Sequence, residues 1–309
     1  MRVLIAGGSG FLGSALSERL VGEGAAVTWL SRAPDRKRAP EAVEVRGYDA
    51  LAPGDAWGAV VNLAGAGITD RRWSEARKRE LVDSRLGPTR TLLDWMRTCI
   101  DRPRVLLSGS AVGWYGDRGD APLTEDSDFH DEFAHRLCAQ WEAAALEAEA
   151  LGVPVVLLRT GIALHPDGGM LGRLLPPFRL GLGGRLGDGT QVLSWIARED
   201  WVEAVRFLMG LHLDDAASAG PRGVFNLAAP APVTNAEFTS ALAQALGKRT
   251  FLPVPAPALR LALGEMSTLL LGGQRVLPRR LAPAGFAFRH PRLAPCLQAQ
   301  LGRGAARAG

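Results

Sequence analysis

The chain of 309 residues is 47% hydrophobic and 22% charged, so it can bury a full core as one large domain or two unequal ones. No apolar run approaches the roughly 18 residues of a membrane span, which argues against a membrane-spanning protein. The N-terminus enters a strand pattern without a signal sequence. The three cysteines are widely spaced, which argues against a disulfide scaffold and a zinc site. The absence of a span and of a signal sequence predicts a cytoplasmic protein without a membrane partner, and the spacing of the cysteines predicts no metal. The net charge of +4 comes from arginines spread along the chain, which favours an anionic small ligand over nucleic acid.

Short β-branched runs alternate with longer amphipathic segments over the first two-thirds of the chain, which predicts an α/β fold, a doubly wound parallel sheet with helices on both faces. We expect strands at 2–6, 27–31, 43–46, 59–63, 105–110 and 155–159. We expect helices at 11–24, 74–83, 87–100 and 131–151.

The pattern changes after about residue 161, where glycine and proline become frequent and predict a loop-rich region. A strand near 223–228 is expected to return to the main sheet, and helices are expected at 234–246 and 256–271. We therefore divide the chain into a dinucleotide-binding domain at 1–165 and a small substrate lobe at 166–309, with a distinct C-terminal part from about 248.

A glycine-rich turn follows the first strand directly, with the sequence GGSGFLG at residues 7–13. Gly7, Gly10 and Gly13 match the spacing that allows a tight turn, a close approach of the backbone to a pyrophosphate, and close packing of helix on strand. Phe11 and Leu12 open the expected helix, whose N-terminus attracts the anion. The turn predicts a Rossmann-type dinucleotide site; the alternative is a structural turn.

The end of the second strand distinguishes NADP from NAD, because an acid there binds the ribose of NAD whereas a cation accommodates the 2′-phosphate of NADP. This chain has Ser31 and Arg32 at that position, followed by the basic run 36–38. A hydroxyl and a guanidinium both donate hydrogen bonds to phosphate, so we expect NADP(H) as the cofactor.

Several motifs together resemble a known group, the atypical extended short-chain dehydrogenase/reductases of the NAD(P)-dependent epimerase/dehydratase family, in the uncharacterised sugar-nucleotide epimerase-like (YfcH-like) branch. The motifs are GGSGFLG, NLAG at 62–65, RRW at 71–73, DSR at 83–85, SGSAVGWYG at 108–116, RTGIAL at 159–164, LLPPFRLGLGG from 174, TNAEF at 234–238, RTFLPVP from 249 and GQRVLPRRL at 273–281. The resemblance covers nearly the whole chain and implies a small C-terminal domain peculiar to this branch.

The resemblance also implies further cofactor contacts. Leu63, Ala64 and Gly65 would lie along the adenosine side, Glu80 and Arg85 would point toward the cofactor, and Ile162 and Ala163 would back the nicotinamide. Arg85 could instead be a surface arginine paired with Asp83 or Glu80, and the apolar residues could be core.

The acid–base pair of the ordinary family is absent. That pair is a tyrosine activated by a lysine four residues later on one helix face. In the family, an acidic residue usually follows the lysine. When that acid is aligned with Glu142 in the segment FAHRLCAQWE, Ala134 takes the tyrosine position and Cys138 takes the lysine position. The chain has only two tyrosines, Tyr48 and Tyr115, and neither has a lysine four residues later.

The remaining candidates for catalysis are Ser110, at the end of a strand, and Tyr115, in the glycine-flanked loop that follows. Tyr115 would need a cationic neighbour to lower its pKa, and packing or ligand stacking is the alternative. His130 and His135 could act as general acids, although surface histidines are common. Cys138 is expected to be an inert buried thiol.

Two hypotheses follow. The first is an NADP(H)-dependent oxidoreductase or epimerase with a non-standard active site, acting on a carbonyl or sugar-nucleotide substrate and assembling as a homodimer. Candidate substrate contacts in the loop-rich region are Arg179, Arg185 and Trp195. The second is a catalytically weak or inactive protein that binds NADPH as a sensor or regulator, because the cofactor signals persist while the acid–base pair is lost.

Overall fold

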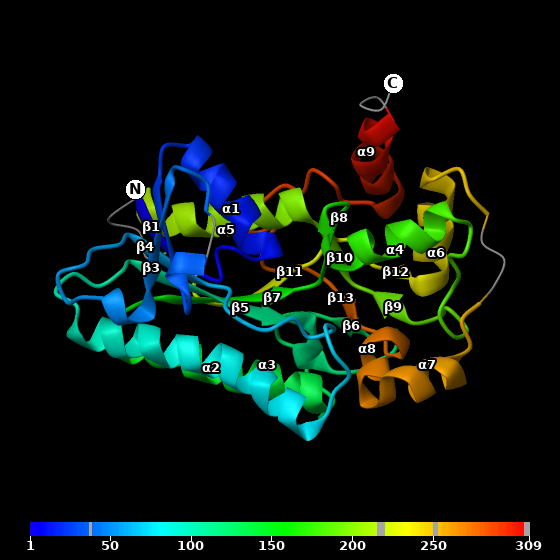
Figure 1. Cartoon of the computed structure of the whole chain (residues 1–309), viewed down its shortest axis with the longest axis horizontal. Coiled ribbons are helices and arrows are strands. Elements are labelled where there is room, and N and C mark those ends of the chain that lie inside the picture. The colour runs from blue at the N-terminus through cyan, green and yellow to red at the C-terminus, as the bar shows by residue number, and fades with distance from the viewer. Residues whose placement is uncertain (37–38, 215–219, 250–252, 306–309) are drawn as a thin grey trace.

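Seven parallel strands form the central sheet of the computed structural model, which describes residues 1–36, 39–214, 220–249 and 253–305 (Figure 1). Their order across the sheet is β11 (Gly223–Leu227), β7 (Val155–Thr160), β5 (Val105–Ala111), β4 (Ala59–Asn62), β1 (Arg2–Ala6), β2 (Ala26–Ser31) and β3 (Val43–Gly47). The strand order reverses between β1 and β4, as in a doubly wound sheet. All six predicted strands are present, and the predicted return of the chain to the sheet is confirmed, since β11 pairs with β7.

Helices cover both faces of this sheet, as the sequence predicted. α1 (Phe11–Gly22) and α5 (Arg198–Leu213) lie on one face, and α2 (Glu75–Thr98) and α3 (Phe133–Leu146) lie on the other (Figure 1). The strands alternate their apolar side chains between two core clusters, one under each helix pair, which explains why they are buried on both sides. Helix α5 was not among the predicted elements.

Two predicted helices at 74–83 and 87–100 are in fact one helix, α2. It passes through Gly87 and Pro88, although a proline lacks the N–H group that continues the ladder. The prediction of a break there was wrong because the helix is buried along its length: Leu81 lies before the proline and Leu92 after it, and both are buried. Tertiary packing outweighs the local cost.

Predicted helix 131–151 is α3 followed by the 3₁₀ turn η4 (Glu147–Leu151). It begins at Phe133, two residues later than predicted, and the chain leaves η4 at Gly152 with φ +79°. That left-handed conformation favours glycine, so the predicted stop at this position is confirmed.

The second part of the chain forms a smaller layer beside the sheet. β8 (Ile162–His165) pairs with β10 (Trp195–Ala197), β9 (Val192–Leu193) pairs with β12 (Val233–Thr234), and α4 (Gly169–Arg179), α6 (Asn235–Ala245) and α9 (Leu293–Ala305) pack around them. The prediction of a loop-rich region was wrong at α4, which forms despite Pro176 and Pro177 because Leu171, Leu175 and Phe178 bury one face. The division into two domains stays a prediction.

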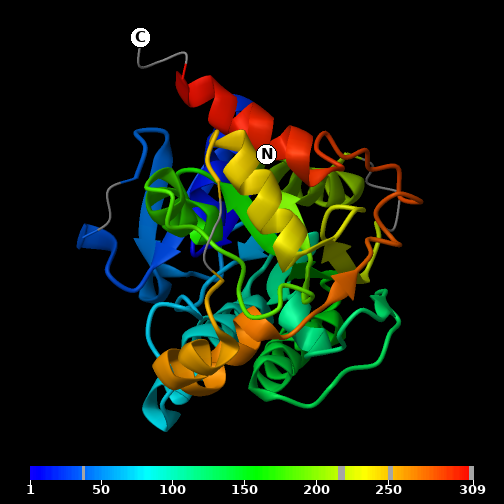
Figure 2. The ribbon, with the colours of Figure 1, turned by 90° about the vertical axis from the view of Figure 1, so that its right-hand side faces the viewer.

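The predicted helix 256–271 is divided into α7 (Ala256–Leu263), the 3₁₀ turn η5 (Gly264–Ser267) and α8 (Thr268–Leu271). Gly264 interrupts it with φ +60°, a conformation that a helix cannot contain. The chain then forms a separate two-stranded sheet, in which β13 (Arg275–Val276) pairs in parallel with β6 (Pro122–Leu123). Figure 2 views this end of the molecule, with α6 in front and α7 below it. Within the described ranges, no helix is both long and apolar enough to cross a membrane.

Candidate functional site

The glycine turn between β1 and α1 is closed so tightly that side chains cannot enter it. Gly7 has φ +81°, and a Cβ atom there would lie 2.7 Å from the backbone of Leu63. A Cβ atom on Gly13 would lie 2.4 Å from the carbonyl oxygen of Gly7. α1 begins at Phe11 without a side-chain cap or an acid in its first turn. The turn therefore offers a helix N-terminus with free N–H groups, which fits a pyrophosphate.

A cavity of about 630 Å³ lies between the end of β2 and the first half of α2. Its lining residues are Arg32, Tyr48, Ala76, Arg79, Glu80, Asp83, Ser84, Gly87, Pro88 and Thr91. The volume falls within the ordinary range for small-ligand sites. The structure thus brings together two residues predicted to contact the cofactor, Arg32 and Glu80, from segments almost fifty residues apart.

The charges in this cavity are arranged unevenly. Glu80 pairs with Arg71 at 2.7 Å and with Arg77 at 2.9 Å, and the hydrogen bond from Arg77 lowers the pKa of Glu80. Arg32 is exposed and forms no ion pair within the described residues. Tyr48, on the 3₁₀ turn η2 (Tyr48–Ala50) after β3, has its pKa raised to about 12 by burial, although the charge of Arg32 acts in the opposite direction. Arg32 is therefore available to an anionic ligand.

Ser31 ends β2, and its hydroxyl accepts a hydrogen bond from the backbone N–H of Ala33 at 3.1 Å. The hydroxyl hydrogen remains for another acceptor. Of the basic run next to it, Lys37 and Arg38 lie outside the described residues, as do residues 250–252 of the RTFLPVP motif.

Arg85 does not have the surface pairing that was its alternative. It forms an ion pair with neither Asp83 nor Glu80 in the described part of the chain. Its guanidinium donates to the carbonyl oxygens of Leu81 at 2.9 Å and Ala66 at 3.3 Å, and its carbon lies 5.2 Å from the ring centre of Trp141 on α3. Burial lowers its pKa below the usual value of an arginine. Arg85 is thus a partly buried cation between α2 and α3.

The loop after β4 lies directly against this cation. A Cβ atom on Gly65 would lie 3.0 Å from the guanidinium carbon of Arg85, so glycine is needed for the close packing. Ala64 is buried, and Leu63 packs partly against the core. Ile162 and Ala163 begin β8, which follows β7 directly in the chain, and are half-buried. The predicted contacts therefore follow the carboxyl ends of β1, β2, β4 and β7, where an open α/β sheet binds ligands.

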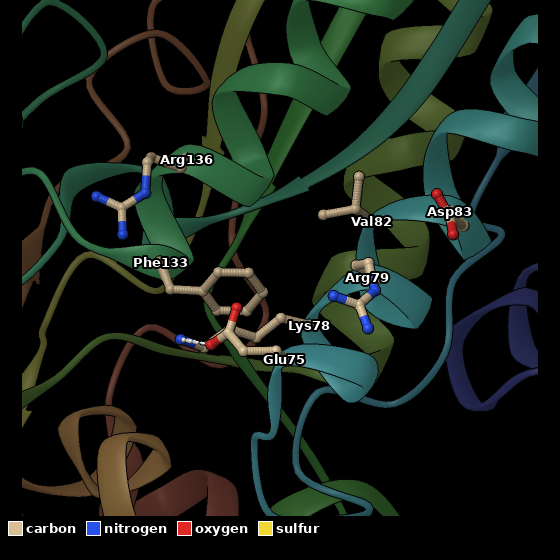
Figure 3. Close-up of a pocket in the computed structure, with 7 residues that line it drawn as sticks. All are labelled: Glu75, Lys78, Arg79, Val82, Asp83, Phe133 and Arg136. Atoms are coloured by element: carbon tan, nitrogen blue, oxygen red, sulfur yellow. Dashed lines mark hydrogen bonds and ion pairs between the residues drawn. The ribbon is translucent and has the colours of Figure 1, made fainter.

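A second cavity, of about 300 Å³, lies between α2 and the first residues of α3 (Figure 3). Lys78, far in sequence from FAHRLCAQWE, lies here with its ammonium 5.3 Å from the ring centre of Phe133. It pairs with Glu75 at 3.2 Å and with Glu265 at 2.5 Å. Lys78 belongs to α2 and lies beside Phe133, the first residue of α3, where it is already paired. It therefore does not take the lysine position at Cys138.

The strand-end serine is held by a buried ion pair. Ser110 donates its hydroxyl hydrogen to Glu142 at 2.5 Å, and Arg159 donates two hydrogen bonds to the same carboxylate, both at 2.8 Å. All three side chains are buried. Since the hydrogen of Ser110 is directed at Glu142, its oxygen can accept a hydrogen bond from a ligand but is poorly placed to donate one.

Tyr115 has the cationic neighbour that catalysis would need, because the guanidinium of Arg159 lies 5.0 Å from its ring centre. It is nevertheless fully buried, and its hydroxyl donates to Asn226 at 2.7 Å. Burial raises the pKa of Tyr115, and the charge of Arg159 only partly opposes this. A substrate could reach this phenol only if the 3₁₀ turn η3 (Val112–Tyr115) moved.

The space beside Ala134 and Cys138 is occupied by the backbone of η3. A Cβ atom on Gly113 would lie 3.3 Å from the Cβ of Ala134 and 4.0 Å from the sulfur of Cys138. Burial raises the pKa of Cys138 to about 11, with the charge of Glu142 acting in the same direction. The thiol is therefore protonated at neutral pH, as expected for an inert cysteine.

The two nearby histidines differ in their surroundings. His135 is buried, its Nδ1 lies 2.5 Å from the carbonyl oxygen of Trp114, and its ring stacks on Phe129 at 3.7 Å. His130 is exposed, with its backbone N–H donating to Tyr115. Neither ring is directed at Ser110 by a hydrogen bond in the described structure.

Glu142, Arg159 and Asn226 are the polar residues around the site whose joint role sequence reasoning missed. Arg159 could have been noticed as a charge at the end of an otherwise apolar strand. Among the candidate substrate contacts, Arg179 and Arg185 are exposed, whereas Trp195 is fully buried and donates to Ala231. In the described residues, no group of three or more histidine, cysteine, aspartate or glutamate side chains could hold a metal.

The chain matches known protein families in two segments. Residues 3–228 match the model of the NAD dependent epimerase/dehydratase family, and residues 254–300 match a domain of unknown function, DUF1731. The chain belongs to the NAD dependent epimerase/dehydratase family. This confirms the predicted family and its Rossmann-type fold.

Among similar proteins, Epimerase family protein Mb2239 of Mycobacterium bovis is 42% identical over 294 residues, which are 93% of each chain. The human epimerase family protein SDR39U1, solved with NADPH, aligns with a TM-score of 0.87 and 34% identity over 98% of this chain and 99% of that one. A UDP-galactose 4-epimerase aligns over all of both chains with a TM-score of 0.75 but only 19% identity, so that likeness concerns the fold alone.

Proposed function

We propose that the chain binds NADP(H), with the 2′-phosphate at Ser31 and Arg32, and acts as an oxidoreductase or epimerase on a carbonyl or sugar-nucleotide substrate. The observation that carries the proposal is the cavity of about 630 Å³ between the face of α2 and Arg32, which forms no ion pair in the described part of the chain. It lies beside a glycine turn that leads into an uncapped helix N-terminus. The similar human SDR39U1, crystallised with NADPH, supports the choice of cofactor.

The residues present fit this cofactor along its length. Gly7, Gly10, Phe11, Leu12 and Gly13 would hold the pyrophosphate; Ser31, Arg32, Leu63, Ala64, Gly65, Glu80 and Arg85 would hold the adenosine side and the central part; Ile162 and Ala163 would back the nicotinamide. The bound cofactor supplies or accepts a hydride, and the protein supplies placement. A homodimer and a cytoplasmic location remain predictions.

At the reacting end, Ser110 is the group that we expect to contact substrate. Its oxygen can accept a hydrogen bond from a substrate hydroxyl while Glu142 holds its hydrogen. Tyr115 stays a candidate that must first leave the core. This arrangement suits the hydroxyl form of a substrate better than the carbonyl form, because the carbonyl form would need a donor.

One observation favours the alternative, a sensor or regulatory protein that binds NADPH without turnover. Ser110, Tyr115 and Cys138 are all buried, and the first two already have hydrogen-bond partners. The cofactor side would then remain functional while the acid–base side serves only the fold.

The cofactor proposal is tested by Arg32→Asp. Arg90→Asp is the matched control, since Arg90 is another exposed arginine on the neighbouring helix α2 but does not line the cavity. Loss of charge-assisted bonds to a phosphate costs about 1.5–3 kcal/mol, so NADPH affinity should fall at least about tenfold while NADH affinity does not fall. Fluorescence titration measures both. An unchanged ratio of the two affinities in Arg32→Asp would show that the 2′-phosphate binds elsewhere.

Turnover separates the two functions. Cofactor oxidation with carbonyl compounds, or formation of the epimer from nucleotide sugars without net cofactor oxidation, supports the enzyme if Ser110→Ala abolishes or strongly slows it with NADPH affinity retained. Tight NADPH binding without turnover on any member of the panel supports the sensor.

A further inference from the structure

Several apolar side chains are strongly exposed at the end of the molecule whose ribbon faces the viewer in Figure 2. Four large hydrophobic side chains in the described structure are more than 60% exposed, and three of them lie here: Leu180 at 75%, Leu182 at 66% and Leu261 at 82%. Leu180 and Leu182 belong to the glycine-rich turn after α4, and Leu261 belongs to α7. Isolated exposed leucines are ordinary, but three at one end indicate a contact surface.

Helix α7 is left largely uncovered by the rest of the described chain, although Leu263 at its end packs against the cluster around Trp73. Seven of its eight residues, APALRLAL, are apolar, and none of the eight is buried. The turn and the helix are joined structurally, because the N–H of Val254 donates to Arg185 at 2.8 Å and the N–H of Gly187 donates to Val254 at 2.9 Å. They therefore form one surface, here called the leucine end and defined by residues 179–187 and 253–263.

The charge of the leucine end and its flanks has a single sign. Segments 171–187 and 246–264 contain six basic residues and no aspartate or glutamate, which exceeds the net charge of +4 of the whole chain. Five of these residues, Arg179, Arg185, Lys248, Arg249 and Arg260, are exposed and form no ion pair within the described ranges. The acids at its borders are already engaged: Glu265 pairs with Lys78, and Asp188 accepts from Thr190.

We propose that the leucine end docks on an anionic lipid surface. Apolar side chains that project from a turn and a helix, surrounded by exposed cations that form no ion pair within the described residues, suit a phosphate-bearing headgroup layer above an acyl layer. A protein partner would need a matching shape, whereas a bilayer surface accepts projecting leucines individually. The expectation of no membrane partner rested on the absence of a spanning segment, and surface attachment is a different mode of contact.

The experiment uses the full chain and sedimentation with vesicles of phosphatidylglycerol and phosphatidylcholine in equal parts. Binding is expected to these vesicles, to be weaker with pure phosphatidylcholine, and to weaken as salt is raised. Leu180→Ser combined with Leu182→Ser, and separately Leu261→Ser, should each weaken binding about tenfold or more. Arg179→Gln combined with Arg185→Gln should weaken it roughly thirtyfold, at about 1 kcal/mol for each charge.

Ile100→Ser is the matched control, because Ile100 is 79% exposed and follows the end of α2 that lies opposite α7 in Figure 1. It should leave vesicle binding unchanged, and all variants should retain the wild-type unfolding temperature and NADPH affinity. The proposal is overturned if the wild type does not bind the anionic vesicles, or if the leucine variants bind as well as Ile100→Ser. It is also overturned if the wild type self-associates and Leu261→Ser makes it monomeric, since this end would then be an interface between copies. Vesicle binding without NADPH binding would instead overturn the proposed function.

Discussion

The two ends of the candidate site differ in what their polar groups are bound to. At the adenosine end, Arg32 is exposed beside a cavity and has no ion pair within the described residues. At the acid–base end, Ser110, Glu142, Arg159 and Tyr115 are buried and bind one another or a neighbouring strand. The first end is arranged for an anion from outside, and the second has become part of the core.

This difference bears on the positions at which the ordinary family has a tyrosine and a lysine. The positions of the missing tyrosine and lysine are not empty, because Gly113 brings η3 against Ala134 and Cys138. A polar site that is lost in this way is replaced by packing, and mutations there should affect stability first. Mutations at the adenosine end should affect affinity first.

The largest expected effect that tests this contrast is on stability, in Glu142→Ala. Removing the carboxylate leaves Arg159 buried without a counter-ion, which costs about 3–5 kcal/mol of the free energy of unfolding. Glu147→Ala is the matched control, since Glu147 begins the turn η4 directly after the same helix and pairs with Arg97 in an exposed position, and its loss should cost less than about 1 kcal/mol. Urea unfolding measures both. Equal losses would mean that the buried pair is no part of the core.

The next effect is a pH dependence. Burial raises the pKa of Cys138 from 9.0 to about 11, so the folded state holds this proton more tightly than the unfolded chain does. The resulting stability is complete below about pH 9 and is lost as the pH rises through about 11. Between pH 8 and 11 the free energy of unfolding should therefore fall by roughly 2–3 kcal/mol more in the wild type than in Cys138→Ala. Parallel curves for the two proteins would contradict the buried, neutral thiol.

The smallest effect concerns Tyr115→Phe, which removes the hydrogen bond to Asn226 and should cost about 1 kcal/mol of stability. Tyr48→Phe serves as the comparison, because no hydrogen bond from that hydroxyl is seen in the described structure, and it should cost less. If a turnover assay shows instead that Tyr115→Phe loses activity at unchanged stability, the phenol is catalytic and the contrast between the two ends is wrong.

Much of the sheet and of the cofactor side was predictable because it depends on local sequence. Strand β1 with its following turn follows from four apolar residues and correctly spaced glycines, and the neighbouring NADP signal needs only Ser31 and Arg32. The route of α2 through Pro88 and the formation of α4 through Pro176 depend on burial against distant segments, which local propensity does not contain.

The acid–base side was predictable only as an absence. The sequence shows that no tyrosine precedes a lysine by four residues, but it does not show what fills the space. Glu142, which accepts from Ser110, lies on α3, 32 residues further along the chain. Arg159, which binds Glu142, lies on β7, 49 residues from Ser110. Asn226, the partner of Tyr115, lies on β11. Only the folded topology brings these groups together, so Glu142, Arg159 and Asn226 could not be assigned from spacing.

The segment after α8 has a practical consequence for dividing this chain into pieces. β13 pairs with β6, and Arg280 pairs with Asp126 at 2.5 Å. The side chain of Asn226, on the edge strand β11, donates to the carbonyl oxygen of Leu277. The C-terminal segment thus holds the last strand of the nucleotide-binding sheet. A fragment cut at residue 228, where the match to the epimerase/dehydratase model ends, would lose these supports. The cofactor-binding part should therefore be studied in the full-length chain.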